Sequence, residues 1–240
     1  MKPIGMRACS LVVVSLVLAG SAGASGILYE QTFDGPGLPA DWSFDTDGAW
    51  SVVNATLDQG YSTPRPGHAT AWAGDLGWTD YSVEMDFMFL EFGEHSMEAG
   101  LGLRHDQSDP GGNFFVSRVS WRGGTEGWNL EIVRTNASEI HIPLNQTLVE
   151  DVWYTMRCEI TDVYLQVWVN DILYDVGSVN TDGFVAPASG NIGVWSNMAH
   201  TQFDNVIVRG DAPVPEPATL TILLAMGAGL AASRRAGRGR

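Results

Sequence analysis

The chain has 240 residues, a formal net charge of −15 and two cysteines, Cys9 and Cys158. Residues 25–211 hold 27 of the 28 acidic residues and no lysine. A segment this acidic repels phosphate backbones, so its charge argues against a nucleic-acid partner. Because Cys158 is the only cysteine in that segment, an intramolecular disulfide is excluded there.

Residues 1–24 have the pattern of a secretory signal peptide. Lys2 and Arg7 precede an apolar run from Leu11 to Ala19, and Ala22-Gly23-Ala24 is the small-x-small pattern after which signal peptidase cuts. The run is shorter than the ~20 residues of a membrane span. We therefore expect a signal helix that directs export through the Sec machinery and is then removed; an N-terminal anchor helix is the alternative.

Residues 25–211 alternate apolar and polar side chains in short runs, as the strands of a sandwich or barrel do. In the clearest run, 152–160, one face carries only apolar side chains: Val152, Tyr154, Met156, Cys158 and Ile160. A slip of one residue would expose this whole face to water, so the register should be fixed. A second inward row of five side chains is predicted for 81–89.

Turn residues separate these runs and predict their pairing. The run 163–169 meets 172–176 across Asn170-Asp171, and both of these residues tolerate positive φ, which predicts a type I′ hairpin. About a dozen short strands without helices indicate antiparallel pairing in two packed sheets, an all-β sandwich. Further strands are expected near Leu28–Phe33, Trp50–Leu57, Ala99–Arg104, Asn113–Trp121, Trp128–Arg134, Asn191–Ser196 and Phe203–Arg209.

After the sandwich, a Pro-rich linker at 212–217 leads to an apolar stretch at 218–232 and a basic end. This pattern predicts a transmembrane helix whose arginines hold the C-terminus in the cytoplasm. At ~15 residues the span is shorter than a usual one, so we expect it to be transient.

The tail resembles the PEP-CTERM sorting signal of Gram-negative bacteria. The resemblance rests on Val214-Pro215-Glu216-Pro217, the apolar helix and the arginine cluster with Arg234 and Arg235, in that order. It implies that an exosortase, an inner-membrane cysteine protease, cuts near the motif and passes the protein to the cell surface. A plain C-terminal anchor is the alternative, and under both interpretations residues 25–211 face outward from the inner membrane.

The segment between the two ends resembles the concanavalin A-like lectin/glucanase superfamily, specifically its laminin-G-like and 3-keto-disaccharide hydrolase-type sandwiches. The order of several short segments along the chain carries the resemblance: Thr32-Phe-Asp-Gly35, Gly48-Ala-Trp-Ser-Val-Val53, Ala99-Gly-Leu-Gly-Leu-Arg104, Asn113-Phe-Phe-Val116, Trp153-Tyr154, Gly193-Val-Trp-Ser196 and Phe203-Asp-Asn-Val-Ile-Val208. It implies a jelly-roll sandwich over residues 25–211. Members of the superfamily bind or cleave carbohydrate, so the resemblance implies fold more directly than activity.

Glycosidases of this superfamily that resemble laminarinases carry Glu-x-Asp-x-x-Glu on one strand. Here Glu84-Met-Asp86 begins such a motif, but the next acid is Glu91, which faces the opposite side in an unbroken strand. These three acids are the catalytic candidates, and we expect a non-catalytic domain. In the alternative role they form an acid row that pairs across strands with Arg104 or Arg157.

Aromatic and charged residues near strand ends suggest carbohydrate binding, because sugar C–H faces stack on aromatic rings and polar side chains fix the hydroxyls. The candidate ligand-binding residues are Arg104, Asp106, Trp121, Arg122, Trp128, Trp153 and Trp168. Alternatively, these indoles cover the ends of the sandwich.

A structural calcium ion is also expected, since relatives of the fold often hold one between the first and last strands. Asp34 and Asp204 match those places, and oxygen ligands suit Ca²⁺. Asp45-Thr-Asp47 and Asp106-Gln-Ser-Asp109 are alternative sites.

Three functions compete at this point. A surface protein that binds extracellular polysaccharide or matrix accounts for the tail, the sandwich and the broken acid motif. A glycoside hydrolase uses the same fold but needs acids that this strand does not align. A purely structural surface protein needs no site at all.

Overall fold

The protein is described from a computed structural model that covers residues 26–45, 49–60, 68–92, 97–105, 114–121, 127–134 and 137–210. The predicted signal peptide, the linker, the sorting tail, Asp106 and Arg122 lie outside these residues. Across the ranges given above, no helix is long and apolar enough to cross a membrane.

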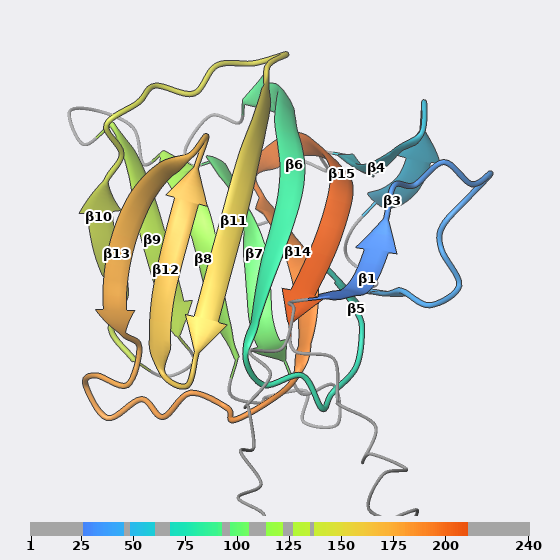
Figure 1. Cartoon of the computed structure of the whole chain (residues 1–240). Helices are drawn as coiled ribbons and strands as arrows, with labels where there is room; N and C mark the ends of the chain where they lie inside the picture. Colours follow the sequence, from blue (N-terminus) through green and yellow to red (C-terminus); the bar gives the residue numbers. More distant parts are fainter. Residues whose placement is uncertain are drawn as a thin grey trace, which may run out of the picture.

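The described residues form fifteen strands and no helix (Figure 1). They are β1 (Gly26–Gln31), β2 (Ser43–Phe44), β3 (Ala49–Val53), β4 (Thr56–Gly60), β5 (His68–Ala73), β6 (Tyr81–Phe92), β7 (Met97–His105), β8 (Phe115–Trp121), β9 (Trp128–Arg134), β10 (Ile140–Pro143), β11 (Trp153–Thr161), β12 (Tyr164–Val169), β13 (Ile172–Ser178), β14 (Asn191–Asn197) and β15 (Ala199–Gly210).

The strands form two stacked antiparallel sheets, as Figure 1 shows. The eight-stranded sheet has the order β13-β12-β11-β6-β15-β4-β3, with β1 paired to β15. The seven-stranded sheet has the order β10-β9-β8-β7-β14-β5-β2. The two-sheet antiparallel sandwich predicted from the alternation is therefore confirmed.

The core lies between the sheets and is built from the predicted inward rows. Tyr81, Val83, Met85, Phe87 and Phe89 of β6 are all at most 3% exposed. From β11, Tyr154, Met156, Cys158 and Ile160 are also buried, and burial raises the pKa of the Cys158 thiol to about 12. This cysteine is thus a small core side chain, as its place in the alternation predicted.

Local turn chemistry fixes the register of the eight-stranded sheet. Asn170 and Asp171 both have positive φ, 49° and 63°, which is the conformation that the predicted type I′ turn requires. Two expectations about strand bounds were wrong. Val152 precedes β11 and is 41% exposed, and the expected strand 50–57 is a hairpin that turns at Asn54-Ala55.

Each sheet also has an outer face. We call the outer face of the eight-stranded sheet the acidic face, because it carries Glu84 and Asp86 of β6. We call the outer face of the seven-stranded sheet the polar face. Its side chains are Glu98, Arg118, Ser120, Asn129, Glu131, His141, Trp195 and Asn197.

Candidate functional site

The acidic face carries the predicted catalytic trio, and its geometry argues against catalysis there. Between the pairs Phe89–Thr201 and Glu91–His200, β6 has one residue more than β15, so it contains a β-bulge at Leu90. Phe89 and Phe92 both pack against the core, so Glu91 returns to the face of Glu84. The expectation that these two acids face opposite sides was therefore wrong. Seven residues at about 3.3 Å each still separate them by about 20 Å, whereas a retaining pair needs ~5 Å.

The acids of this face are engaged within the sheet. Asp86 accepts hydrogen bonds from Thr155 Oγ1 at 2.6 Å and Asn205 Nδ2 at 2.8 Å. Glu84 lies opposite Arg157 in the β6–β11 ladder and 3.9 Å from Arg209 Nη1. The cross-strand acid row is therefore present, but Arg104, the other predicted partner, belongs to the opposite sheet.

Arg104 is a buried structural residue of β7. Its guanidinium donates to the backbone carbonyls of Thr79, Asp162 and Pro187 at 2.6 to 3.0 Å, and to Asp80 at 3.3 Å. These bonds tie three loops to one end of the sandwich. Because these bonds already occupy its guanidinium, Arg104 holds the fold together instead of offering a free donor to a sugar.

The predicted aromatic ligands do not form one site. Trp153, 42% exposed, and Trp168 lie on the acidic face, where the guanidinium carbon of Arg157 lies 3.8 Å from the centre of a Trp168 ring. Trp121 and Trp128 instead pair across the β8–β9 hairpin of the other sheet. They line a pocket of about 540 Å³ at the end of that hairpin.

The predicted calcium residues lie near each other on β15 and just after β1, and these first and last strands pair. Burial raises the pKa of Asp204 above its usual range, and the charges of Asp86 and Asp34 add to that rise. Within the described residues, three potential metal ligands come within 4.8 Å of one another only at Glu131, Glu139 and His141. Calcium at Asp34 and Asp204 stays a prediction.

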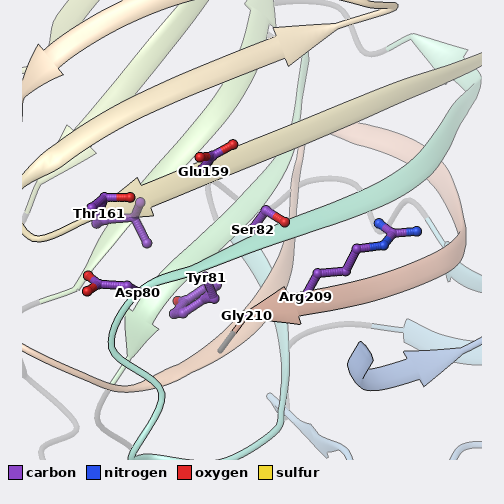
Figure 2. A pocket seen from close by; sticks show the side chains of 8 residues that line it. Asp80, Tyr81, Ser82, Glu159, Thr161, Arg209 and Gly210 are labelled. Carbon is purple, nitrogen blue, oxygen red and sulfur yellow. The ribbon is translucent and has the colours of Figure 1, made fainter. Parts of the chain in front are cut away.

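A pocket of about 400 Å³ opens near the point where β15 ends (Figure 2). Ser82, Glu159 and Arg209 line it from three adjacent strands. Asp80 at its rim accepts a hydrogen bond from the backbone N–H of Asp162 at 2.7 Å in addition to the one from Arg104. This carboxylate thus holds the loop, and the pocket contains none of the predicted site residues.

The polar face has the most elaborate chemistry of the described residues. Ladder register sets its side chains in two rows across the sheet. One row is Asn197, Glu98, Ser120 and Asn129, and the other is Trp195, Gly100, Arg118, Glu131 and His141. Although they point away from the core, Glu98, Arg118 and Glu131 are at most 6% exposed. Such burial of charged groups requires that they be paired.

Arg118 joins the acids of the polar face. Its Nη1 lies 2.7 Å from Glu98 Oε2, and its Nε and Nη2 donate to Glu131 Oε2 at 3.0 and 2.8 Å. Its Nη2 also lies 3.4 Å from Glu139 Oε1. A Cβ on the cross-strand neighbour, Gly100, would come within 2.6 Å of Arg118 Cβ, so glycine at this position leaves room for the arginine side chain.

Glu98 is held through one of its two oxygens. Arg118 Nη1, Asn197 Nδ2 (3.0 Å) and Trp195 Nε1 (3.4 Å) all approach Oε2, and within the described residues no hydrogen bond ends on Oε1. Burial raises the pKa of Glu98 above its usual range, although Arg118, Asn197 and Trp195 oppose the rise. The carboxyl group is therefore oriented by three donors that converge on one oxygen.

His141 lies beside two carboxylates at the edge of the polar face. Its Nδ1 is 3.2 Å from Glu131 Oε1 and its Nε2 is 3.4 Å from Glu139 Oε2. The three side chains could also hold a metal ion. His141 and Glu139 are partly exposed, so this edge of the ion cluster is accessible from solvent.

Aromatic rings lie on the same face. His68 stacks on Trp195 with ring centroids 4.1 Å apart, and Trp72 stacks on His105 at 3.8 Å. Trp72 lies flat over two glycines, because a Cβ on Gly102 or Gly193 would come within 2.3 Å of its ring. The face thus combines oriented carboxylates, a guanidinium and indoles.

Two buried polar atoms of this face, Ser120 Oγ and Asn197 Oδ1, have no hydrogen-bond partner within the described residues. Both residues are ladder neighbours of Glu98. Ser120 is fully buried. Unpaired buried polar atoms cost stability, so in a native protein they call for an explanation such as a ligand.

Comparison with known proteins identifies the family of this chain. Residues 29–209 match the model of the 3-keto-alpha-glucoside-1,2-lyase-like domain family. The chain belongs to this family. No curated protein matches its sequence.

Solved structures share the sandwich at low identity. A carbohydrate-binding module from Bacillus subtilis, CBM66, superposes with a TM-score of 0.53 at 14% identity, covering 71% of this chain and 96% of that one. An endo-beta-1,3-glucanase from Pyrococcus furiosus gives 0.55 at 12%, covering 80% and 97%. A galectin-like protein from Bacillus subtilis gives 0.57 at 16%, covering 78% and 97%. This member of the 3-keto-alpha-glucoside-1,2-lyase-like family thus has a lectin/glucanase-like β-sandwich, the fold that the resemblance to the concanavalin A-like superfamily implied.

The sequence reasoning missed Glu98, Arg118, Glu131 and His141. The sequence did hold a signal for one pair: Arg118 and Glu131 each lie three residues from Trp121 and Trp128, the two ends of the hairpin, so they pair in register. The partners of Glu98 on β14 are distant in sequence, and His141 lies on β10, a strand that was not predicted.

Replacing Arg104 tests its assignment as a structural residue. Arg104→Gln should lower the free energy of unfolding by roughly 2–4 kcal/mol, because it leaves buried carbonyl groups without donors. Arg157→Gln, on the half-exposed acidic face, should cost less than about 1 kcal/mol. Urea denaturation of the two variants measures both values, and equal losses would contradict the assignment.

Proposed function

We propose that the protein is an exported surface protein that binds carbohydrate on its polar face. The observation that carries this proposal is the buried set of Glu98, Arg118 and Glu131 on an outer sheet face, next to the hydroxyl of Ser120, which has no hydrogen-bond partner in the part of the chain that the structure describes. Sugar hydroxyls both donate and accept hydrogen bonds, so they can satisfy a carboxylate oxygen and a serine hydroxyl together. The exposed ring of His68, which is stacked on Trp195, supplies an aromatic surface beside these polar groups.

The similar proteins support the same ligand class. One of the solved structures is named a carbohydrate-binding module and another an endo-beta-1,3-glucanase. A purely structural surface protein is less well supported, because its outer face would be more stable without unpaired buried polar atoms. A hydrolase that uses Glu84, Asp86 and Glu91 is disfavoured by the spread of these acids along β6.

Ser120→Ala provides a sharp test because its hydroxyl makes no hydrogen bond to any described residue. The variant should keep the thermal stability of the parent, while its dissociation constant for the bound glycan should rise about 2–10-fold, the value of one hydrogen bond. The measurement is calorimetric titration with laminarin, after a panel of soluble polysaccharides has established binding.

The matched control is Ser117→Ala, which is equally buried on the same strand but faces the core. It should leave affinity unchanged. Equal effects of the two substitutions, or binding by neither parent nor variants, would contradict the proposal.

A second candidate function is elimination from a 3-keto-glycoside, the activity in the name of the family. The orientation of Glu98 favours it, since Oε2 is held by three donors and Oε1 has none among the described residues. A ketone at C3 acidifies the C2–H bond. A base removes this proton, the electron pair forms the C1=C2 double bond, and the oxygen substituent leaves C1 and takes up a proton.

Glu98→Gln separates binding from this chemistry. With methyl 3-keto-α-glucoside as substrate, the parent should release methanol and an unsaturated ketone, and the variant should be at least about 100-fold slower. Nuclear magnetic resonance in deuterated water follows both products and exchange at C2. A parent that forms no enone excludes the lyase activity but leaves the binding proposal standing.

Export and sorting complete the proposal. The signal-peptide pattern of residues 1–24 and the PEP-CTERM-like tail from Val214 to Arg240 support delivery to the cell surface by Sec and an exosortase. We expect the mature protein to begin near Ser25 and to end near Pro217. Mass spectrometry of both ends, on protein recovered from a host with an exosortase, measures this, and an intact tail would favour the plain anchor.

A further inference from the structure

The pocket at the end of the β8–β9 hairpin lies beside the polar face and is not used by the proposed function. Its walls come from the hairpin and from the segment that follows β10: Trp121, Gly127, Trp128, Pro143, Leu144, Asn145, Gln146 and Thr147. Its volume, about 540 Å³, is within the range of small-molecule sites.

The two indoles of the pocket have different roles. Trp128 is buried and packs on Phe89 and Phe92, with ring centroids 5.6 and 5.7 Å away. Trp121, its cross-strand partner, is partly exposed and stacks on no other ring among the described residues. Trp128 is therefore an anchor in the core, while Trp121 packs against the core with part of its ring and leaves the exposed part to a ligand.

The opposite wall is held in place and carries unused polar groups. Leu144 N donates to Trp128 O at 2.9 Å, and Gln146 bonds to Val169 O and to Asn170 Nδ2, so the segment is fixed to both sheets. The exposed side chains of Asn145 and Thr147 make no hydrogen bonds within the described residues. An amide and a hydroxyl opposite an indole are the groups that bind a sugar ring.

The pocket is also next to the polar face. The pair Trp121–Trp128 directly follows the pair Ser120–Asn129 in the ladder, about 3.3 Å further along the strands. The indoles of Trp121 and Trp128 point to the inner side of the sheet, so the polar face meets the pocket at Pro143, which pairs with Asn129 and lines the pocket. A chain of sugars that leaves the polar face past Pro143 reaches the pocket.

We propose that this pocket binds a further sugar unit of an oligosaccharide whose first units occupy the polar face. The inference rests on the proposed function and names its ligand class, an oligosaccharide rather than a single sugar or disaccharide. Binding through two contiguous subsites makes affinity increase with the length of the glycan.

The test compares a disaccharide with a hexasaccharide on the full-length protein. The probes are β-1,3-, β-1,4- and α-1,4-linked gluco-oligosaccharides, each titrated calorimetrically as the dimer and the hexamer. For the linkage that binds, the hexamer should bind about tenfold more tightly than the dimer, the effect of one stacked ring with its hydrogen bonds.

Substitutions assign this gain to the pocket. Trp121→Ala should remove the gain for the hexamer and leave the affinity for the dimer unchanged, which also shows that the variant is folded. Asn145→Ala, which shortens an exposed side chain and keeps the backbone hydrogen bond to Tyr174, should remove part of it. Tyr164→Ala, at an exposed aromatic residue of the other sheet, should have no effect.

The possible outcomes separate the two proposals. Equal affinity for dimer and hexamer, or a gain that survives Trp121→Ala, overturns the proposed role of the pocket and leaves the polar face as the binding site. Binding of the hexamer that depends on Trp121 but not on Ser120 overturns the proposed role of the polar face instead. If no oligosaccharide of the three series binds, both proposals fail for glucans.

Discussion

The ion cluster around Arg118 constrains both the fold and the chemistry of the polar face. Its guanidinium joins Glu98 of β7 to Glu131 of β9, so charge pairing and backbone hydrogen bonds fix the same register of three neighbouring strands. All three side chains are buried, and loss of Arg118 would leave the buried Glu98 without its cation. Well-packed apolar residues would often stabilise a sheet at least as well as a buried ion cluster. Under the proposed function, glycan binding is a further reason for the cluster besides register.

The two outer faces of the sandwich differ in how completely they satisfy their own polar groups. On the acidic face, Asp86 accepts hydrogen bonds from neighbouring strands, and the guanidinium of Arg157 stacks on Trp168. On the polar face, Ser120 Oγ has no hydrogen-bond partner among the described residues, and Glu98 directs one oxygen away from its three donors. Under the proposed function, this second arrangement gains hydrogen bonds when a glycan binds.

The sandwich could be predicted from the sequence because its signal is local. Alternation in 81–89 and 154–160 fixes which side chains are buried, and Asn170-Asp171 fixes one turn through backbone preference alone. Strands without clear alternation, such as β5, were missed: five of its six residues are buried, so neither face carries a polar pattern.

The polar face could not be predicted in the same way, because it depends on the order of strands in the sheet. Glu98 meets Asn197 only because β7 pairs with β14, a partner 99 residues away. Arg104 shows the opposite case. An arginine at a strand end suggested a ligand contact, but its bonds to three loop carbonyls depend on loops that no local pattern specifies.

The location of a bound glycan tests the central claim most directly. A crystal structure of the protein soaked with a gluco-oligosaccharide that it binds should place a sugar ring against His68, the ring stacked on Trp195, with hydroxyls within hydrogen-bond distance of Glu98 Oε1 and Ser120 Oγ. A glycan found instead on the acidic face, against Trp153 and Trp168, would contradict the account.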